Sequence, residues 1–208
     1  EYLNPADTTA TRMISDLDVP HRLSISGILE LPFGKGRRFL SDADGFLNGL
    51  VGGWQIQGVY TYQSGFPVPF GNYNLNTGVT SGDLFYNGGD IAIDNPTTDR
   101  WFNTGAFTSI LTDSSNNATP VNHLRTFPYR VDDLRRDSIN NIDLSLIKDI
   151  QLKGDVKVQL RAEFINAFNE PYFPGPVTGM TTATFGQITA SNQENYARRA
   201  QLGAKFLF

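Results

Sequence analysis

Apolar and polar positions alternate with a period of two along several stretches of the chain. The most regular stretch is 54–66, where every second residue from Trp54 to Tyr62 is apolar, aromatic or glycine, and the residues between them are mostly polar. Successive side chains of a strand point to opposite faces, so this period predicts strands with one apolar and one polar face. The predicted strands cover residues 21–31, 54–66, 142–152, 156–169 and 197–208. We therefore expect an all-β, antiparallel chain.

The polar faces of the predicted strands 54–66 and 156–169 are rich in amide and charged side chains. Such side chains are poor material for the core of a soluble domain, but they suit the water-filled lumen of a membrane barrel whose other face contacts lipid. The residues predicted to face a lumen are Gln55, Gln57, Gln63, Gln159, Arg161 and Glu163. We expect this row to line a solute path or to form hydrogen bonds with a plug domain or neighbouring strands.

The last strand, 197–208, ends the chain on Phe208. Its apolar row includes Leu202 and Phe206, and polar or side-chain-free residues lie between them. Aromatic side chains are enriched at the lipid–water boundary, so the closing strand of an outer-membrane barrel is expected to end there on an aromatic ring. This strand therefore predicts a transmembrane β-barrel, with the chain end on the periplasmic side.

The lengths of the connections agree with this direction, except that 33–53 is longer than a periplasmic connection usually is. Counting back from the end, connections 33–53 and 153–155 are periplasmic, and 67–138 and 170–195 are extracellular. The segment 67–138 has no clear periodicity and carries what look like isolated aromatics, Trp101, Phe102 and Phe107. A connection of this length would be abnormal in a compact soluble domain, whereas long extracellular loops are expected of barrels.

The same direction predicts two belts of aromatic side chains at the membrane borders. The predicted girdle residues are Trp54, Tyr60, Tyr62, Phe164, Phe168 and Phe206, with Trp54, Phe206 and Phe208 at the inner border. Lys148 falls on an apolar face, where a charge costs roughly 2–4 kcal/mol at the midplane and about 0–1 kcal/mol near an interface. We therefore expect Lys148 at the rim.

Five strands cannot close a barrel, and open strand edges in lipid leave backbone groups without hydrogen bonds. Residues 1–208 are therefore expected to be the C-terminal part of a larger barrel, or to pair with other chains. The chain starts without Met or a leader pattern, which also favours a piece of a longer polypeptide.

The connection 33–53 contains a basic turn around Lys35, Arg37 and Arg38. A phosphate-binding loop would need a strand–loop–helix context that is not visible here, so we interpret these residues as a solvated periplasmic turn, with lipid headgroups as a second partner. Ser41 followed by Asp44 resembles a capping box. It would start a short helix with Phe46, Leu47, Leu50 and Val51 on one face.

Composition narrows the function classes. Charged residues make up 18% of the chain, below the roughly 25% of ordinary soluble domains, and aromatics make up 12%. The net charge of −4 offers no footprint for nucleic acid. The absence of cysteine excludes disulfides and thiolate metal sites. No apolar run reaches the roughly 18 residues of a membrane helix.

Several blocks together resemble the C-terminal barrel of Oar-like TonB-dependent receptors of the bacterial outer membrane. The blocks are HRLSISGILELPFGKGRRF at 21–39, GGWQIQGVYTYQSGFP at 52–67, RWFNTGAFT at 100–108, NIDLSLIK at 141–148 and LRAEFINAFN at 160–169. The resemblance weakens within 68–138. It implies a barrel of about 22 strands, an N-terminal plug, and contacts with TonB and the barrel-assembly machinery. By the same resemblance, Leu202, Phe206 and Phe208 form the C-terminal assembly signal.

Candidate catalytic and metal-binding residues do not form a recognisable pattern. His21 and His123, with Asp132 and Asp133, lack a nucleophile and a defined spacing. The carboxylates of the long loop lack the twelve-residue calcium-binding pattern; they are Asp83, Asp90, Asp94 and Asp99. We expect no enzyme activity, no metal and no cofactor.

Three functions are compatible with the sequence. The favoured one is the channel wall and outer loops of a TonB-dependent transporter for a large or scarce solute, with outer-membrane lipid and the rest of the barrel and plug as partners. The second is a non-transporting surface or structural protein of the outer membrane. The third is a soluble β-sandwich binding module, which would also alternate and carry aromatics.

Overall fold

The computed structural model describes residues 2–3, 8–70, 86, 88–107, 127–152, 154–179, 182–189 and 195–208. These residues belong to two compact units. We call residues 21–63, 139–172 and 195–208 the strand unit, and residues 1–20, 64–138 and 173–194 the loop unit. The predictions for Asp83, His123 and Lys153 lie outside the described residues.

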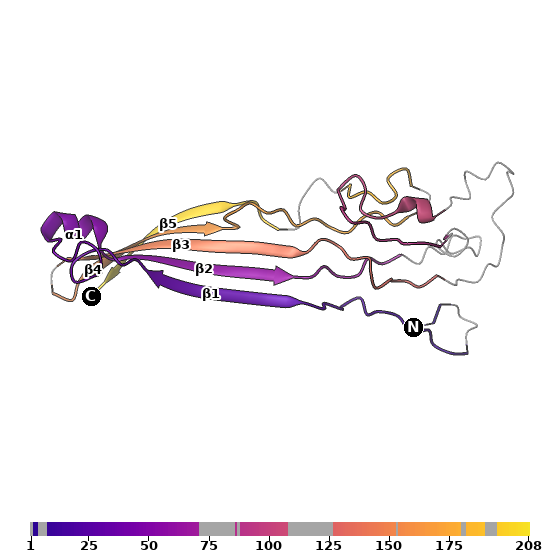
Figure 1. The fold of residues 1–208 in the computed structure, drawn as a ribbon, viewed down its shortest axis with the longest axis horizontal. Helices are drawn as coiled ribbons and strands as arrows, with labels where there is room; N and C mark the ends of the chain where they lie inside the picture. Colours follow the sequence, from indigo (N-terminus) through magenta and orange to yellow (C-terminus); the bar gives the residue numbers. More distant parts are fainter. Residues whose placement is uncertain are drawn as a thin grey trace. The chain divides into compact units, whose positions relative to one another are not determined.

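The strand unit is one antiparallel sheet of five strands in chain order (Figure 1). The strands are β1 (Arg22–Glu30), β2 (Trp54–Gln63), β3 (Ile139–Gln151), β4 (Lys157–Ile165) and β5 (Arg199–Leu207). Each strand pairs with the next one along the chain. The expected all-β, antiparallel architecture is confirmed for these residues.

The strand ends differ from the predicted ones. β3 begins at Ile139 rather than at residue 142, and β2 ends at Gln63 rather than at residue 66. β4 ends at Ile165 because Asn166 has a positive φ of 50°, which no strand accommodates. Phe168 therefore lies in the turn after β4, and its predicted place in the alternating strand is wrong.

The register aligns the apolar positions of all five strands. Leu29 pairs with Ile56, Ile56 with Leu146, Leu146 with Ala162, and Ala162 with Leu202. A slip of one residue in any pair would move that strand's apolar row to the other face. The result is one continuous apolar face, on which the Leu202 side chain is 86% exposed. The strand unit holds this face open rather than folding it into a core.

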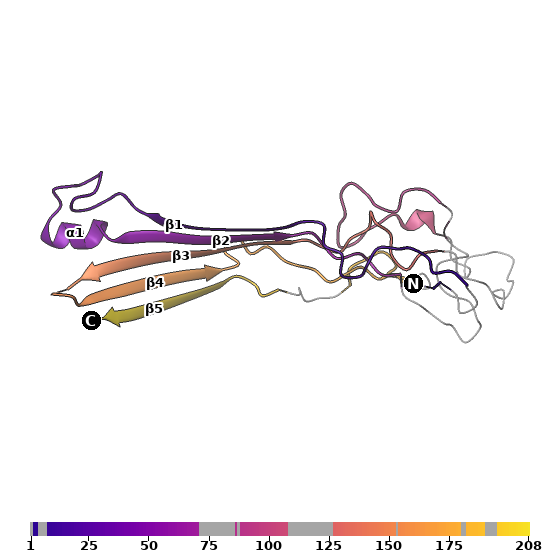
Figure 2. The ribbon, with the colours of Figure 1, turned by 90° about the horizontal axis from the view of Figure 1, so that it is seen from below.

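The sheet is open, with β1 at one edge and β5 at the other (Figure 2). The described residues therefore do not close into a barrel by themselves. Each edge offers unpaired N–H and C=O groups for further strands.

The loop unit has an aromatic core and little regular structure. Its buried cluster consists of Val68, Phe70, Ile91, Phe102, Ala106, Phe107, Phe127 and Leu134. The ring centroids of Phe70 and Phe127 are 5.1 Å apart, and Phe102 and Phe185 lie 5.2 Å apart, both pairs edge to face. A short 3₁₀ helix, η1 (Thr104–Ala106), is its one helix among the described residues. The interpretation of Trp101, Phe102 and Phe107 as isolated loop aromatics is wrong, because all three belong to this core or pack on it.

Polar side chains hold the loop unit together where strands are lacking. The Arg135 guanidinium donates to the Asp18 carboxylate at 2.7 Å and to the Gly65 carbonyl at 3.2 Å. The Trp101 indole N–H donates to the Arg135 carbonyl at 2.8 Å. Gly65 is required here, because a Cβ at this position would lie 1.9 Å from the Arg136 carbonyl oxygen. Arg135 thus connects segments distant in the sequence.

The predicted short helix exists as α1 (Gly45–Val51), but its predicted cap is wrong. Asp44 occupies the N-cap position without a side-chain capping bond, and the Ser41 hydroxyl donates to Asp42. Asp44 instead accepts a hydrogen bond from the Lys35 ammonium at 2.9 Å, and this bond, aided by the Gly45 N–H, lowers the pKa of its carboxyl. No helix among the described residues has the length and hydropathy to cross a membrane.

The polar face of the sheet as a candidate functional site

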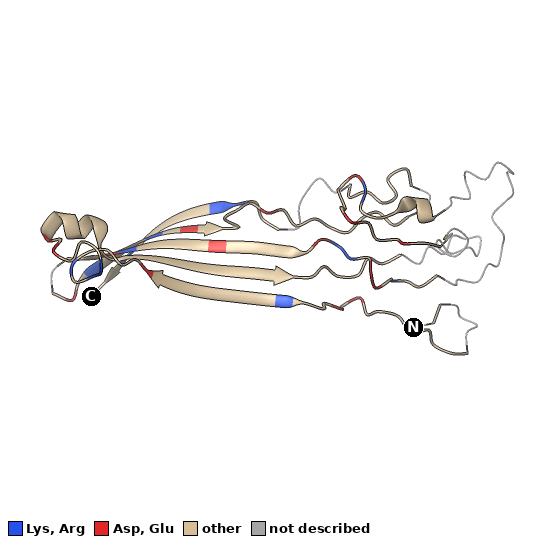
Figure 3. Cartoon of the chain, in the orientation of Figure 1, with Lys and Arg blue, Asp and Glu red and all other residues tan. Residues whose placement is uncertain are grey.

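The register brings the predicted lumen-facing residues onto the face opposite the apolar one. Gln57 lies opposite Ser145, which lies opposite Glu163; Gln55 lies opposite Ile147, which lies opposite Arg161. All six predicted residues share this face: Gln55, Gln57, Gln63, Gln159, Arg161 and Glu163. Apart from Lys148, the other charged residues of the strands are in register with this same face; Figure 3 colours the charged positions.

Side chains on the polar face form bonds between neighbouring strands. The Gln159 amide donates to Asp149 on β3 at 2.9 Å, and the Gln201 amide on β5 donates to Glu163. Within β4, Arg161 and Glu163 lie 3.7 Å apart, a partly exposed ion pair worth at most about 1 kcal/mol. The two cross-strand bonds support the sheet, and all of these side chains leave its face hydrophilic. The sequence did not single out Asp149 or Gln201, since their partners are known only once the register is known.

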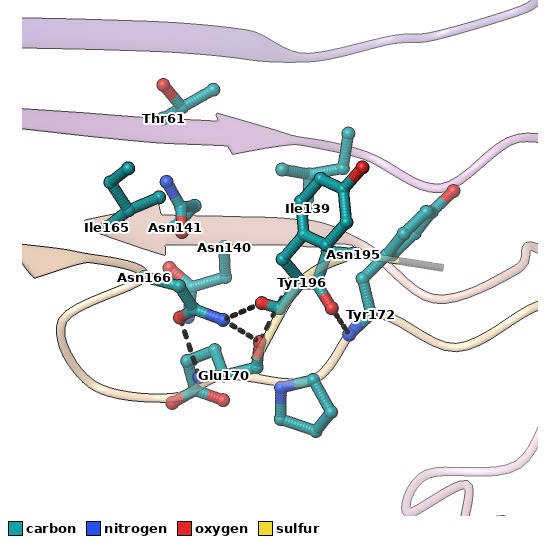
Figure 4. Close-up of a pocket in the computed structure, with 11 residues that line it drawn as sticks. Thr61, Ile139, Asn140, Asn141, Ile165, Asn166, Glu170, Tyr172, Asn195 and Tyr196 are labelled. Carbon is teal, nitrogen blue, oxygen red and sulfur yellow. Dashed lines mark hydrogen bonds between the residues drawn. The ribbon is translucent and has the colours of Figure 1, made fainter. Parts of the chain in front are cut away.

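A pocket of about 290 Å³ lies where β3 and β4 meet the segments beside them (Figure 4). Its wall is made by Thr61, Ile139, Asn140, Asn141, Ile165, Asn166, Glu170, Pro171, Tyr172, Asn195 and Tyr196. The predicted topology assigns this end of the sheet to the extracellular side. Amides and two tyrosine rings can bind a neutral polar molecule, but the wall has no paired nucleophile and base.

Asn166 is the centre of this pocket's wall and is only 3% exposed. Its amide donates to the carbonyls of Glu170 and Tyr196 at 2.9 and 3.0 Å, and its oxygen accepts from the Glu170 N–H at 2.9 Å. Asn195 completes the network by accepting from the Tyr172 N–H and donating to the Glu170 carbonyl, both at 2.9 Å. Sequence reasoning missed Asn166. The available signal was an asparagine at the end of an alternating segment, where this residue tolerates positive φ.

Lys148 lies on the apolar face, yet its charged side chain is buried, with only 5% of the residue exposed. It lies opposite Trp54, the first residue of β2, so it is near the strand ends. Its ammonium donates to the carbonyls of Leu50 and Gly52 and lies 5.2 Å from the centre of the Trp54 ring. These contacts satisfy a charge that an apolar face could not otherwise hold.

The predicted girdle residues separate along the sheet. Trp54 and Phe206 lie toward the end with α1 and the β3–β4 turn, while Tyr60, Tyr62 and Phe164 lie toward the other end, all on the apolar face. Phe168 lies outside the strands, as described above, and Phe208 follows β5 and is fully exposed. The positions of these rings relative to a bilayer stay a prediction.

The candidate catalytic and metal-binding residues form no group in the part of the chain that the structure describes. Within it, no three His, Asp or Glu side chains gather as metal ligands. His21 is exposed immediately before β1. The prediction that the chain has no catalytic, metal or cofactor site stays a prediction.

Comparison with curated proteins and with solved structures gives no significant match. The family model of the outer membrane beta barrel domain, by contrast, matches residues 1–201. The sheet found here, apolar on one face and hydrophilic on the other, is what such a domain requires. The chain therefore belongs to the family of outer membrane beta barrel domains.

Proposed function

We propose that the chain forms channel wall and outer loops of a TonB-dependent transporter that takes up a large or scarce solute across the bacterial outer membrane. The observation that carries this proposal is the open sheet with one apolar and one hydrophilic face. Membership in the family gives the chain an outer-membrane location. The apolar face then contacts lipid, and Gln55, Gln57 and Arg161 face an aqueous interior.

The size of the barrel is part of the proposal. An eight-stranded barrel is narrow enough for side chains to fill, whereas a barrel of about 22 strands holds a plug domain in its lumen. Long polar side chains on neighbouring strands, such as Gln159, Arg161 and Gln201, suit contact with water or a plug better than tight packing inside a small barrel. The resemblance to Oar-like receptors supports the same size.

The loop unit supports a role in recognition. Its core joins residues of both connections predicted to be extracellular, since Phe102 comes from 67–138 and Phe185 from 170–195. Loops with a core of their own present a preformed surface, which lowers the entropy lost on binding a solute. We propose that this surface makes the first contact with the solute, and that no chemical step follows.

The runner-up function is a surface or structural protein of the outer membrane that does not transport. The same preformed loop unit favours it, because recognition needs no channel. The third function, a soluble β-sandwich, is wrong: the chain belongs to an outer-membrane family, and in the described residues no second sheet covers the apolar face.

The decisive experiment uses the complete polypeptide that contains this chain, purified from outer membranes in detergent. Binding of the periplasmic domain of TonB is measured by calorimetry, and limited proteolysis with mass spectrometry tests whether the complete polypeptide contains a plug domain. The transporter proposal expects a plug and saturable TonB binding. A polypeptide with neither would overturn it and leave the non-transporting surface protein.

A further inference from the structure

The connection between β1 and β2, residues 31–53, exposes an unusual number of large apolar side chains. Exposed here are Phe33, Phe39, Leu40, Phe46, Leu47 and Leu50, and Phe46 reaches 88%. Figures 1 and 2 show α1 at the end of the sheet where β1 ends and β2 begins. An apolar surface of this kind, continuous with a sheet that faces lipid, needs a partner.

The amphipathic character of α1 is the inverse of that of a soluble surface helix. Its polar residue Asn48 faces the protein, where its side-chain oxygen accepts from the Lys35 N–H at 2.7 Å. The turn at Gly34 packs closely against the C-terminal end of α1. A Cβ on Gly34 would lie 2.7 Å from the Gly52 Cα and 2.9 Å from the Asn48 side-chain oxygen. Phe46, Leu47 and Leu50 are left exposed. A soluble helix buries its apolar residues and exposes the polar ones, whereas an interfacial helix buries its apolar residues in a membrane.

Two side chains from the apolar face of the sheet hold the C-terminal end of α1. The Trp54 indole N–H donates to the Leu50 carbonyl at 2.9 Å, and the Lys148 ammonium donates to the same carbonyl at 3.4 Å. A cation at this end also complements the partial negative charge of the terminal carbonyls. Because Trp54 and Lys148 project from the face that contacts lipid, the end of α1 adjoins that face.

Charged groups accompany the apolar ones in the same connection. Lys35 pairs with Asp44 at 2.9 Å, Arg37 pairs with Glu30 at 2.8 Å, and the Arg38 guanidinium lies 5.4 Å from the centre of the Phe39 ring. A mixture of aromatic rings, leucines and basic groups is typical of the headgroup region of a bilayer.

We propose that the 31–53 connection is a lipid-binding element, in which α1 inserts Phe46, Leu47 and Leu50 at the boundary between headgroups and acyl chains. The occupant is phospholipid of the leaflet next to this end of the sheet, the periplasmic leaflet in the predicted topology. Arg38 and its neighbours then lie at the level of the phosphates. This inference goes beyond transport: it rests on the outer-membrane family and the lipid-facing sheet, and holds for either outer-membrane function.

Residues 1–208 contain no cysteine, so an introduced cysteine can be labelled uniquely once any cysteine elsewhere in the complete polypeptide has been replaced by serine. Phe46→Cys and Leu50→Cys are introduced separately into the complete polypeptide, labelled with an environment-sensitive fluorophore and reconstituted into phosphatidylethanolamine–phosphatidylglycerol vesicles. Nitroxides at the headgroup or along the acyl chain of added lipids then report depth by quenching. Leu160→Cys is the lipid-facing control and Asp42→Cys, exposed in the same connection, is the aqueous control.

The proposal expects both α1 labels to be quenched several-fold more than the Asp42 label, most strongly by a nitroxide near the top of the acyl chain. Quenching of both α1 labels as weak as that of the Asp42 label would overturn it. A blue-shifted emission without quenching by lipid would overturn it as well, because it would mean that a second copy or another protein covers α1. Both substituted side chains are exposed, so neither change removes a packed core residue.

Discussion

The strand unit and the loop unit place their apolar side chains and pair their backbone groups in opposite ways. In the strand unit, backbone N–H and C=O groups pair between neighbouring strands, and the row of apolar side chains is exposed, as the 86% exposure of Leu202 illustrates. The loop unit has few ladders and buries the aromatic rings of its core, with Phe102 at 0% exposure. In lipid every backbone group needs a partner while apolar side chains need none. In water the apolar side chains must be buried, and loops suffice if their polar groups are satisfied.

The largest effect is expected from emptying the core of the loop unit. Phe102→Ala removes a fully buried ring that packs edge to face on Phe70 and Phe185, and a change of this kind costs about 3–5 kcal/mol. We expect rapid proteolysis of the loop unit while the barrel resists. Leu160→Ala, on the exposed apolar face, is the matched control and should leave protease resistance unchanged. Equal resistance of the two variants would show that the aromatic cluster does not stabilise the loop unit.

The two faces of the sheet are distinguished by adding one charge to each. Leu146 lies in the middle of the apolar face, and Leu146→Arg should cost roughly 2–4 kcal/mol in lipid. Ser145→Arg places the same charge on the polar face, opposite Glu163, and should cost little. The shift in gel mobility between heated and unheated samples measures folded barrel in membranes. Similar losses for both variants would contradict the assignment of the faces.

The hydrogen-bond network around Asn166 should depend on the Asn166 side chain and not only on the positive φ of this residue. Asn166→Ala leaves the Tyr196 carbonyl without its Asn166 donor, removes one of the two side-chain donors to the Glu170 carbonyl and strains a positive φ. Loss of such buried bonds costs about 1–3 kcal/mol. Asn166→Gly removes the same bonds but accepts the φ, so it should recover only part of the loss. Hydrogen exchange of the Glu170 and Tyr172 amides is the measurement. Full protection in both variants would contradict this role.

The smallest effect concerns pH at the turn before α1. The hydrogen bond from Lys35 lowers the pKa of Asp44 from 3.8, so the stabilising contribution is present above the unfolded pKa. It is lost as pH falls through the lower folded pKa. Carbon NMR of the Asp44 carboxyl should show titration below 3.8, and Lys35→Met should return the midpoint toward 3.8. An unchanged midpoint in Lys35→Met would contradict the assigned cause. The exposed position keeps any effect on stability small.

The strands were predictable because alternation is a local property. Every second residue from Leu23 to Leu29, and from Trp54 to Tyr62, can be assigned to one face of its strand without knowing which strand pairs with it. The strand ends were predicted less well, since they depend on single residues such as Asn166, whose positive φ stops β4. The predicted capping box of α1 was wrong because the Asp44 carboxylate accepts a hydrogen bond from the Lys35 ammonium, outside the helix.

By itself, the sequence determined five strands and which side chains share a face, because the pleat of a strand converts a period of two directly into two surfaces. Tertiary structure alone decided three other features. It assembled Phe70, Phe102 and Phe127 into a core, gave Lys148 the carbonyls beside α1, and surrounded Asn166 with Glu170 and Tyr196. In each case the partners are distant in sequence or follow no period, so no local pattern identifies them. The physical reason is that burial and hydrogen bonding depend on which groups meet in space.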